Sequence, residues 1–353
     1  MRDTVTFLQK PETRQETVPR GVAILPVAIA GAYPGEMAHT PLMLSALATS
    51  AVPGFQAVSA QNLSTPERDA ALVHDVNNQP FLIEVSQTDS DETLHRRELA
   101  AASALTEGLR SRLPFRVPQV RGTSEVGGRL LSVSDYLPGT HLTPKAITPV
   151  SAANMGIALA TIHSLPTSGL ADHDRLRRSA LERLRECAAV VDSAAASGLL
   201  PQALLRRWET ACEDQGLWQF DSTVIHGHMH LSRILFDDHA VAAIDGWSDF
   251  HHGDPAADLA WLTLPTHSAF ATAVHTSYVA SRAGADKWIM QRARFSAELD
   301  IAKWLLHGLD TGQDTIVRDA TDMLNTLSDR VSTNMEHALT APVTQIAENP
   351  RAS

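Results

Sequence analysis

The spacing of apolar residues changes its period near residue 139, and this change most constrains the fold of the chain. Before that point, short apolar runs of strand length are separated by polar turns, a pattern typical of β-strands. After it, apolar residues recur every three or four positions over long stretches, as they do in amphipathic helices. The sequence therefore predicts an α+β fold with two lobes, a small β-rich N-lobe and a large helical C-lobe, with a cleft between them.

The first half of the chain predicts several short strands around one long helix. The expected elements are a short helix over 39–51, strands within 55–61, 70–76 and 80–86, a helix over 91–112, and strands over 115–122 and 130–137. Asn77 and Asn78 lie between two apolar runs, which indicates a β-hairpin. The 91–112 helix has apolar positions at mostly helical spacing, and these are Leu94, Leu99, Ala102, Leu105 and Leu109.

The second half predicts a largely helical lobe. Helices are expected over 151–165, 174–196 and 201–215, with further helical stretches at 258–262, 268–284, 288–309 and 313–339. We expect three parts in the chain: an N-terminal extension over 1–50 that packs on the N-lobe, the N-lobe over 51–138, and the C-lobe over 139–353.

Composition excludes several classes of protein. Forty acidic against 29 basic residues give a net charge of -11, which argues against a nucleic-acid surface. Cys187 and Cys212 are the two cysteines, too few for a disulfide framework. The apolar run over 22–33 contains Pro26 and is too short to span a bilayer, and acidic residues precede it, unlike a signal peptide. We expect a cytoplasmic protein with no membrane or nucleic-acid partner.

Titratable residues gather at the ends of three short apolar runs between residues 223 and 262. His226, His228 and His230 alternate after the first run, and Asp245 ends the third. Such positions, where strands pass into loops, often carry chemistry. One hypothesis is a metal-dependent hydrolase, since alternating histidines bind zinc in such enzymes. However, alternate residues of a strand point to opposite faces, so the three histidines are not expected to converge.

The motifs of this stretch, with the order of elements, resemble those of the aminoglycoside and macrolide phosphotransferases, small-molecule kinases with a protein-kinase-like fold. That family has a catalytic loop H-G-D-x-H-x-x-N, then I-D-W, then G-D-P-x-x-D-L. The matching residues are His226, Gly227, His230, Ile244, Asp245, Gly253, Asp254, Pro255, Asp258 and Leu259. ATIHSL at 160–165 is similar to the family's A-x-x-H-x-L helix end. The resemblance extends from Phe55 to the late helices.

The resemblance also implies where a nucleotide would bind. DYLPG at 135–139 is similar to the family's interlobe hinge, which places Asp135, Tyr136 and Leu137 beside the nucleotide base. Glu98 is the candidate for the helix glutamate that holds the phosphate-binding lysine, and Asp245 is the candidate metal ligand. The sequence does not firmly imply a cofactor. If nucleotide binding is retained, the resemblance implies ATP and Mg²⁺.

Three positions that touch phosphate or metal in the family differ in this chain. His228 occupies the position of the catalytic aspartate, and no acid occurs between Ser222 and Phe236. Glu84 occupies the position of the strand lysine, and no lysine occurs between Lys10 and Lys145. Arg233 occupies the position of the metal-binding asparagine.

Two further departures concern the loops that would hold the phosphates and the metal. Asp245 is followed by Gly246 and Trp247, one residue more than the family spacing to G-D-P. No glycine occurs between Gly54 and Gly108, so a glycine-rich phosphate loop is absent from the sequence.

These changes predict altered electrostatics in the cleft. Glu84 would face Glu98, and two like charges in contact cost about 4 kcal/mol at an effective dielectric near 20. Arg96 or Arg97 would offset this repulsion, or Glu84 would point to solvent. We also expect the Arg233 guanidinium to pair with Asp245 and to stand where Mg²⁺ would lie.

The sequence therefore favours a pseudokinase-like member of the family that lacks phosphotransfer and binds a small molecule or a protein partner at the interlobe cleft. The first alternative is an active small-molecule phosphotransferase, acting on an antibiotic or metabolite hydroxyl, with His228 as general base. The second is the metal-dependent hydrolase built on His226, His228 and His230.

Overall fold

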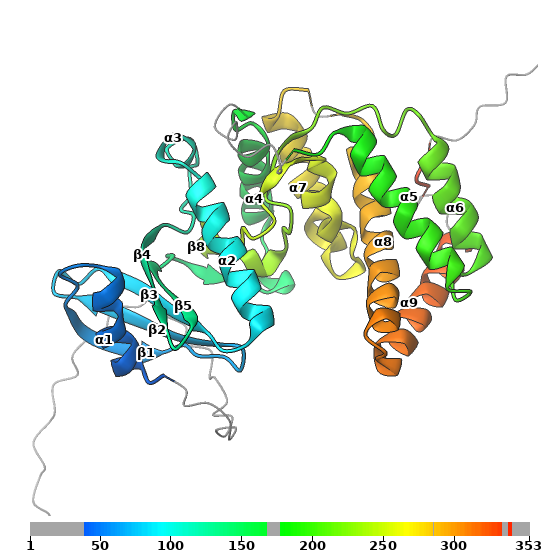
Figure 1. Cartoon of the computed structure of the whole chain (residues 1–353). Coiled ribbons are helices and arrows are strands. Elements are labelled where there is room, and N and C mark those ends of the chain that lie inside the picture. Colours follow the sequence, from blue (N-terminus) through cyan, green and yellow to red (C-terminus); the bar gives the residue numbers. More distant parts are fainter. Residues whose placement is uncertain (1–38, 168–176, 285, 334–337, 341–353) are drawn as a thin grey trace, which may run out of the picture. The chain divides into compact units, whose positions relative to one another are not determined.

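The computed structural model describes residues 39–167, 177–284, 286–333 and 338–340 (Figure 1). All of them belong to one compact unit, residues 37–353. The apolar run over 22–33 and most of the predicted N-terminal extension lie outside the described residues. None of the helices in the described ranges is long and apolar enough to cross a membrane.

The N-lobe is built on a five-stranded antiparallel sheet with strand order β1-β2-β3-β5-β4. Its strands are β1 (Ala57–Asn62), β2 (Arg68–Asp75), β3 (Pro80–Ser86), β4 (Val120–Val126) and β5 (Arg129–Asp135). The predicted hairpin joins β2 to β3. Asn78 takes a positive φ of 60° in its turn, and the Asp75 carboxylate accepts hydrogen bonds from the backbone N–H groups of Asn77 and Gln79.

Alternation along these strands separates an apolar face from a polar one. Ala71, Val73, Ile83, Val85, Leu131 and Val133 point to one side and are buried in a core with Leu44, Ala48 and Phe55. Glu84 lies opposite Ala70 and Ser132 in the ladders, so these residues share the other face. The sheet therefore points Glu84 away from its core.

Helix α1 (Pro41–Ala51) covers the apolar face of this sheet (Figure 1). Thr40 caps the helix, its hydroxyl accepting from the Met43 N–H, and Pro41 occupies the first turn. This confirms the short helix predicted near 39–51. Gly122 on β4 lies directly against the end of α1, where any Cβ would overlap the carbonyl of Ala51.

In the described part of the chain, the C-lobe contains the helices from α4 onward and two small sheets. Its longer helices are α4 (Pro149–His163), α5 (Ala180–Ala196), α6 (Gln202–Glu213), α7 (Ser268–Ser281), α8 (Ile289–Asp310) and α9 (Asp314–Thr333). Strand β7 (Thr223–Ile225) pairs with β10 (His251–Gly253), and β6 (Thr140–His141), β8 (Ile234–Asp237) and β9 (Ala240–Ile244) form a second sheet. These strands hold the loop from His226 to Arg233.

The helix predicted over 91–112 is wrong in its extent. Helix α2 runs over Asp89–Ala104, and a separate short helix α3 follows over Glu107–Arg110. Leu105 leaves the helical conformation and is buried in the core that α2 shares with the C-lobe. Leu94, predicted on the apolar face, is exposed, and its neighbour His95 is buried instead. The strand predicted over 115–122 begins only at Val120, after Pro118.

Truncation of Ile83 tests whether the sheet core holds Glu84 in place. Ile83 is fully buried, so Ile83→Ala is expected to lower the free energy of unfolding by about 2–5 kcal/mol through lost burial and a residual cavity. Val58→Ala, at an exposed strand position, is the control and is expected to cost less than about 1 kcal/mol. Chemical denaturation measures both, and equal effects would contradict the described strand orientation.

Candidate functional site

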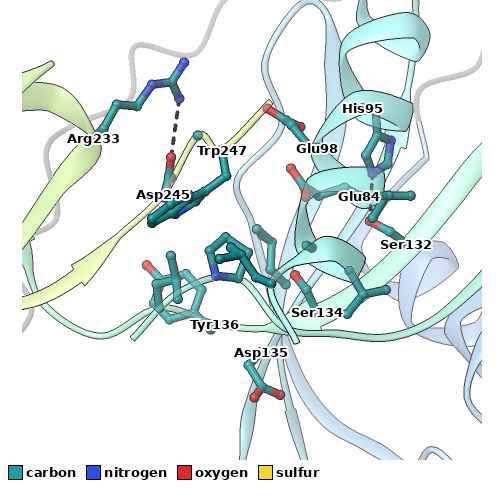
Figure 2. A pocket seen from close by; sticks show the side chains of 18 of the residues that line it. Glu84, His95, Glu98, Ser132, Ser134, Asp135, Tyr136, Arg233, Asp245 and Trp247 are labelled. Atoms are coloured by element: carbon teal, nitrogen blue, oxygen red, sulfur yellow. Dashed lines mark hydrogen bonds and ion pairs between the residues drawn. The ribbon is translucent and has the colours of Figure 1, made fainter. Parts of the chain in front are cut away.

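A cavity of about 320 Å³ lies between the polar face of the N-lobe sheet, helix α2 and the loop that follows β9 (Figure 2). Its polar lining includes Arg68, Glu84, Glu98, Ser132, Arg233 and Asp245, together with His95, Ser134, Asp135, Tyr136 and His141. Apolar side chains of both lobes, including Leu82, Leu99, Val120 and Trp247, form the rest of its wall. This volume and this mixture are typical of a site for a small molecule.

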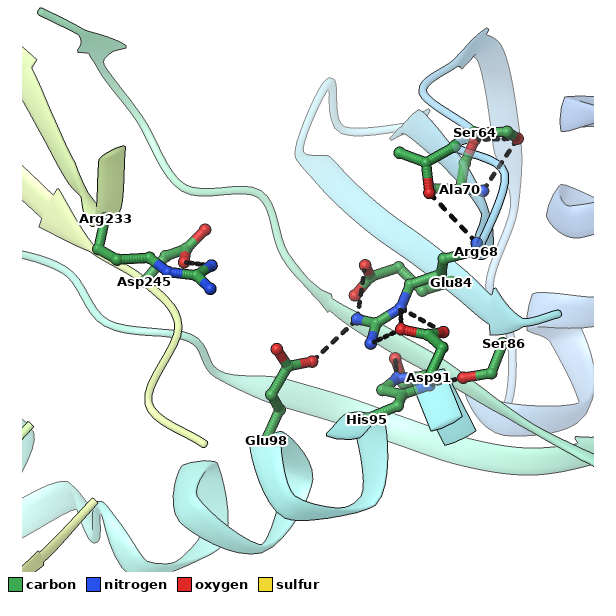
Figure 3. A network of polar contacts seen from close by, with 12 residues as sticks. Ser64, Arg68, Ala70, Glu84, Ser86, Asp91, His95, Glu98, Arg233 and Asp245 are labelled. Atoms are coloured by element: carbon green, nitrogen blue, oxygen red, sulfur yellow. Dashed lines mark hydrogen bonds and ion pairs between the residues drawn. The ribbon is translucent and has the colours of Figure 1, made fainter. Parts of the chain in front are cut away.

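Arg68 on β2 lies at the centre of a cluster of carboxylates (Figure 3). Its guanidinium donates to Asp91 through Nε and Nη2 at 2.9 and 2.7 Å, and through Nη1 to Glu84 at 3.2 Å and to Glu98 at 2.8 Å. All four side chains are largely buried. One guanidinium thus offsets the repulsion between three carboxylates that lie close together.

The sequence does not predict a role for Arg68, because the predicted strand begins at Ala70 and the observed strand β2 begins at Arg68. The signal was the hairpin register: Ala70 pairs with Glu84, and Arg68, two residues earlier, pairs with Ser86 on the same face. The predicted partners of Glu84 were wrong. Arg96 pairs with Glu92, and Arg97 reaches Asp249 in the C-lobe.

The Glu84 side chain points into the cavity and not to bulk solvent (Figures 2 and 3). Burial raises the pKa of this carboxyl to about 7; Arg68 opposes the rise, and Glu98 and Asp245 add to it. Glu84 therefore carries a partial negative charge near neutral pH, at the position where the resemblance implies a lysine.

His95 is buried behind Glu84, at the base of the cavity. Its Nδ1 lies 3.1 Å from the Ser86 hydroxyl and its Nε2 lies 2.8 Å from the Ser132 hydroxyl. Burial, with the nearby Arg68 charge, lowers the pKa of His95 to about 4, so the ring is neutral and joins α2 to the sheet by hydrogen bonds.

Arg233 and Asp245 face each other across the C-lobe side of the cavity (Figure 2). The Nη1 of Arg233 lies 3.4 Å from the nearer Asp245 oxygen, a long hydrogen bond between half-exposed groups. The guanidinium packs over Gly246, where a Cβ would come within 2.6 Å of the Arg233 Nε. The additional glycine after Asp245 therefore makes room for the arginine.

The hinge residues Asp135, Tyr136 and Leu137 line the cavity on the sheet side. Asp135 is held by a bidentate pair with Arg121 at 2.6 and 2.7 Å. The backbone N–H of Asp135 donates to Gln119 and that of Tyr136 to Pro80. The N–H of Leu137 has no hydrogen-bond partner among the described residues. Among the hinge residues Asp135, Tyr136 and Leu137, it is the backbone donor without a partner in the described part of the chain.

Asp258, which is fully buried, organises the loop that follows β7. One of its oxygens accepts from the N–H of His226 at 2.7 Å and lies 3.1 Å from the His163 Nε2, and the other accepts from the N–H of Gly227 at 2.8 Å. Burial opposes ionisation, but these donors hold the pKa of Asp258 below its usual value. The His226 ring in turn lies 2.7 Å from the Asp245 carbonyl.

The three alternating histidines of this loop do not converge. His226 is buried beside Trp247, His228 is exposed, and His230 lies next to Ser232 and Trp261. Among the residues that the structure describes, no three His, Cys, Asp or Glu side chains are placed to hold a metal ion. The geometry therefore gives the hydrolase hypothesis no metal site. His228 does not line the interlobe cavity either.

Comparison with known proteins identifies the family. The model of the phosphotransferase enzyme family matches residues 67–295. The chain belongs to the phosphotransferase enzyme family. No match was found among curated proteins.

Solved structures of the same fold agree. The apoenzyme of macrolide 2′-phosphotransferase MphH from Brachybacterium faecium has 21% identity and a TM-score of 0.65, covering 80% of this chain and 97% of that one. The complex of APH(2")-IIia with GDP and kanamycin has 14% identity and a TM-score of 0.65, and the match covers 83% of this chain and 100% of that one. The streptomycin–ATP–APH(2")-IIa ternary complex has 18% sequence identity and a TM-score of 0.54, and the match covers 76% of this chain and 92% of that one. The predicted kinase-like fold of two lobes is confirmed.

Replacement of Asp258 tests the frame of the loop. Asp258→Asn keeps the size of the side chain but removes its charge and sets an amide against buried donors, so the free energy of unfolding is expected to fall by more than about 2 kcal/mol. Asp300→Asn removes an exposed pair with Lys303 and is expected to change stability by less than about 1 kcal/mol. Thermal and urea unfolding measure both, and a neutral Asp258→Asn would contradict the role assigned to this residue.

The raised pKa of Glu84 predicts a pH-dependent contribution to stability. The folded state holds the Glu84 proton more tightly than the unfolded state, so this contribution is present below about pH 4.5 and is lost as pH rises through about 7. Relative to Glu84→Gln, the wild type should therefore lose on the order of 2 kcal/mol between pH 5 and pH 8.

Urea unfolding of both proteins across this pH range measures the difference. The matched control is Glu182→Gln. Hydrogen bonds from the Ser179 backbone and hydroxyl lower the pKa of Glu182, so its contribution is constant over the same range. A flat difference curve for Glu84→Gln would show that Glu84 is not buried as described.

Proposed function

We propose that this chain is a member of the phosphotransferase family that does not transfer phosphate and that binds a ligand in the interlobe cavity. The observation that carries the proposal is the pairing of Arg233 with Asp245 over Gly246. In the family that the sequence resembles, the corresponding positions hold the metal that neutralises the phosphates.

The donor set around Asp245 does not fit Mg²⁺. This ion prefers about six oxygen ligands in an octahedral arrangement, usually with one or two carboxylates. Here the permanently charged guanidinium of Arg233 lies 3.4 Å from the Asp245 carboxylate. Arg233 also occupies the position at which the resemblance implies a second protein ligand of the metal. A cation at this place would meet like charge. We therefore derive no step through a metal.

The cationic side chains that would bind the phosphates of a nucleotide are also changed. Both guanidinium groups among the described cavity residues already face carboxylates: Arg68 faces three, and Arg233 faces Asp245. Glu84, in place of the strand lysine, adds a negative charge on the side where phosphates would lie. A triphosphate would have to separate these pairs before it gained a cation of its own.

The loop from His226 to Arg233 keeps its frame but presents no carboxylate to a hydroxyl group. His228 has the position of the catalytic aspartate, and its exposed side chain makes no hydrogen bond with another described residue. Without an oriented base, an attacking hydroxyl would be neither positioned nor deprotonated. The cavity itself is retained, with apolar walls and the free N–H of Leu137, and this supports ligand binding.

We also assign the protein to the cytoplasm. The two cysteines are free, and burial raises the pKa of the Cys187 thiol to about 11 and that of Cys212 to about 12. Thiols of this kind are poorly reactive, as is usual for buried cysteines in a reducing compartment.

The proposal predicts that the wild-type chain does not turn over ATP above background with Mg²⁺ or Mn²⁺, in the presence or absence of aminoglycoside or macrolide acceptors. His228→Ala is expected to behave identically, because His228 takes no part in a reaction. ADP release, measured by a coupled assay, decides this. Turnover by the wild type that His228→Ala abolishes would support the alternative of an active kinase.

A variant that carries the family's side chains tests whether the changed side chains account for the proposed lack of Mg²⁺-dependent ATP binding. Glu84→Lys, His228→Asp and Arg233→Asn together are expected to give Mg²⁺-dependent thermal stabilisation by ATP, which the wild type lacks, because a ligand that binds the folded state raises its melting temperature. The exposed substitution Val58→Ala serves as the control. An equal Mg²⁺-dependent stabilisation of the wild type would contradict the proposal.

A further inference from the structure

We propose that the interlobe cavity takes a small organic cation, an ammonium group carried on a body of about nucleoside size, in the place where the resemblance implies a nucleotide. This inference rests on the proposed function, since it names the class of ligand for the same cavity. Such a ligand carries a positive charge, whereas the phosphates of a nucleotide are negative.

The charged groups around the cavity give the first argument. Glu84, Glu98 and Asp245 line the cavity, and Asp91 lies beside them on the far side of Arg68. These four carboxylates face two guanidiniums, those of Arg68 and Arg233. Asp135 is neutralised separately by Arg121. Glu84 is only partly ionised near neutral pH, but the other three carboxylates already exceed the two guanidiniums, so this cluster is net negative. The partly buried position of these groups reduces screening by salt. Such a potential attracts cations and repels phosphates.

In the described part of the chain, two carboxylate oxygens in the cavity are unused hydrogen-bond acceptors. Glu84 and Glu98 each use one oxygen to accept from Arg68, at 3.2 and 2.8 Å. The second oxygen of each accepts no hydrogen bond from another described residue, and both side chains line the cavity (Figure 3). An ammonium group has three donors and no acceptor, so it would satisfy both free oxygens and offset the excess charge.

The rest of the cavity wall suits the uncharged body of such a ligand. Leu82, Leu99, Val120 and Trp247 offer apolar surface to the body of a ligand, and the N–H of Leu137 offers one donor at the hinge. A volume of about 320 Å³ admits a molecule of nucleoside size. Solved structures with this fold include complexes with GDP and with ATP, so nucleosides are suitable probes of shape, and only the charge of their 5′ group needs to change.

Glu84 links cation binding to proton release. The groups that face its carboxyl are Arg68 on β2, Glu98 and His95 on α2, and Asp245 after β9, with Ser132 on β5 beside it. Because burial raises the Glu84 pKa to about 7, a bound ammonium must displace a proton below this pH. Affinity for a cation should therefore rise as pH increases from 6 to 8, whereas an anion would bind less tightly over the same range.

Three probes of one shape test the inference: 5′-amino-5′-deoxyadenosine, adenosine and AMP, which carry a positive, a neutral and a negative 5′ group. Titration calorimetry on the full chain, at low ionic strength and pH 7.5, is expected to give at least about tenfold tighter binding of the amine than of adenosine, with AMP the weakest. The amine's affinity should rise between pH 6 and pH 8. Glu84→Gln should remove this pH dependence and most of the preference.

Glu98→Gln is the second variant, and it is expected to reduce the preference as well, so the test does not depend on the folding of one protein. Glu107→Gln, at an exposed position on α3 outside the cavity, is the matched control and should bind like the wild type. Equal affinities for the three probes, tighter binding of AMP, or no binding of the amine would overturn the cation proposal. Failure of the proposed function would show differently, as ATP turnover by the wild type.

Discussion

The Arg68 guanidinium sets the character of the cavity. It holds Asp91, Glu84 and Glu98 within hydrogen-bonding distance of one charge and so joins β2, β3 and α2. Without it, three carboxylates would face each other in a half-buried space, at a cost of several kcal/mol. The same pairing leaves Arg68 without a free charge, because three acids share its guanidinium. Glu98, the residue that the resemblance implies would hold a strand lysine, is paired with this arginine from the neighbouring strand β2.

The fold and the chemistry of the family separate in this chain. Asp258, His163 and the backbone of His226 and Gly227 still hold the loop after β7 through buried hydrogen bonds. These contacts serve the architecture, and they are intact. Under the proposed function, the positions that the resemblance assigns to phosphate, metal and the attacking hydroxyl are those that differ. Membership of the fold does not by itself establish activity, which depends on the side chains in the site.

The sequence predicted the lobes, the hairpin and the helix that caps the sheet, because these follow from the period of apolar residues and from local signals such as Thr40 and Asn77–Asn78. The resemblance placed Arg233 beside Asp245, and their opposite charges predicted the contact that the structure shows. It did not find Arg68 or the burial of His95, because both depend on strand register and on the way α2 rotates against the sheet. It also extended α2 too far, since burial of Leu105 in a core shared by both lobes ends that helix, and such tertiary packing leaves no local signal.

The central claim is that the cavity has lost its complementarity to a metal-bound triphosphate. The most direct test is equilibrium binding of ATP to the wild-type chain, measured by titration calorimetry with and without Mg²⁺, with adenosine for comparison. The account predicts that ATP binds more weakly than adenosine and that Mg²⁺ gives no gain in its affinity. Binding of ATP that is tighter than that of adenosine and is strengthened tenfold or more by Mg²⁺ would contradict it.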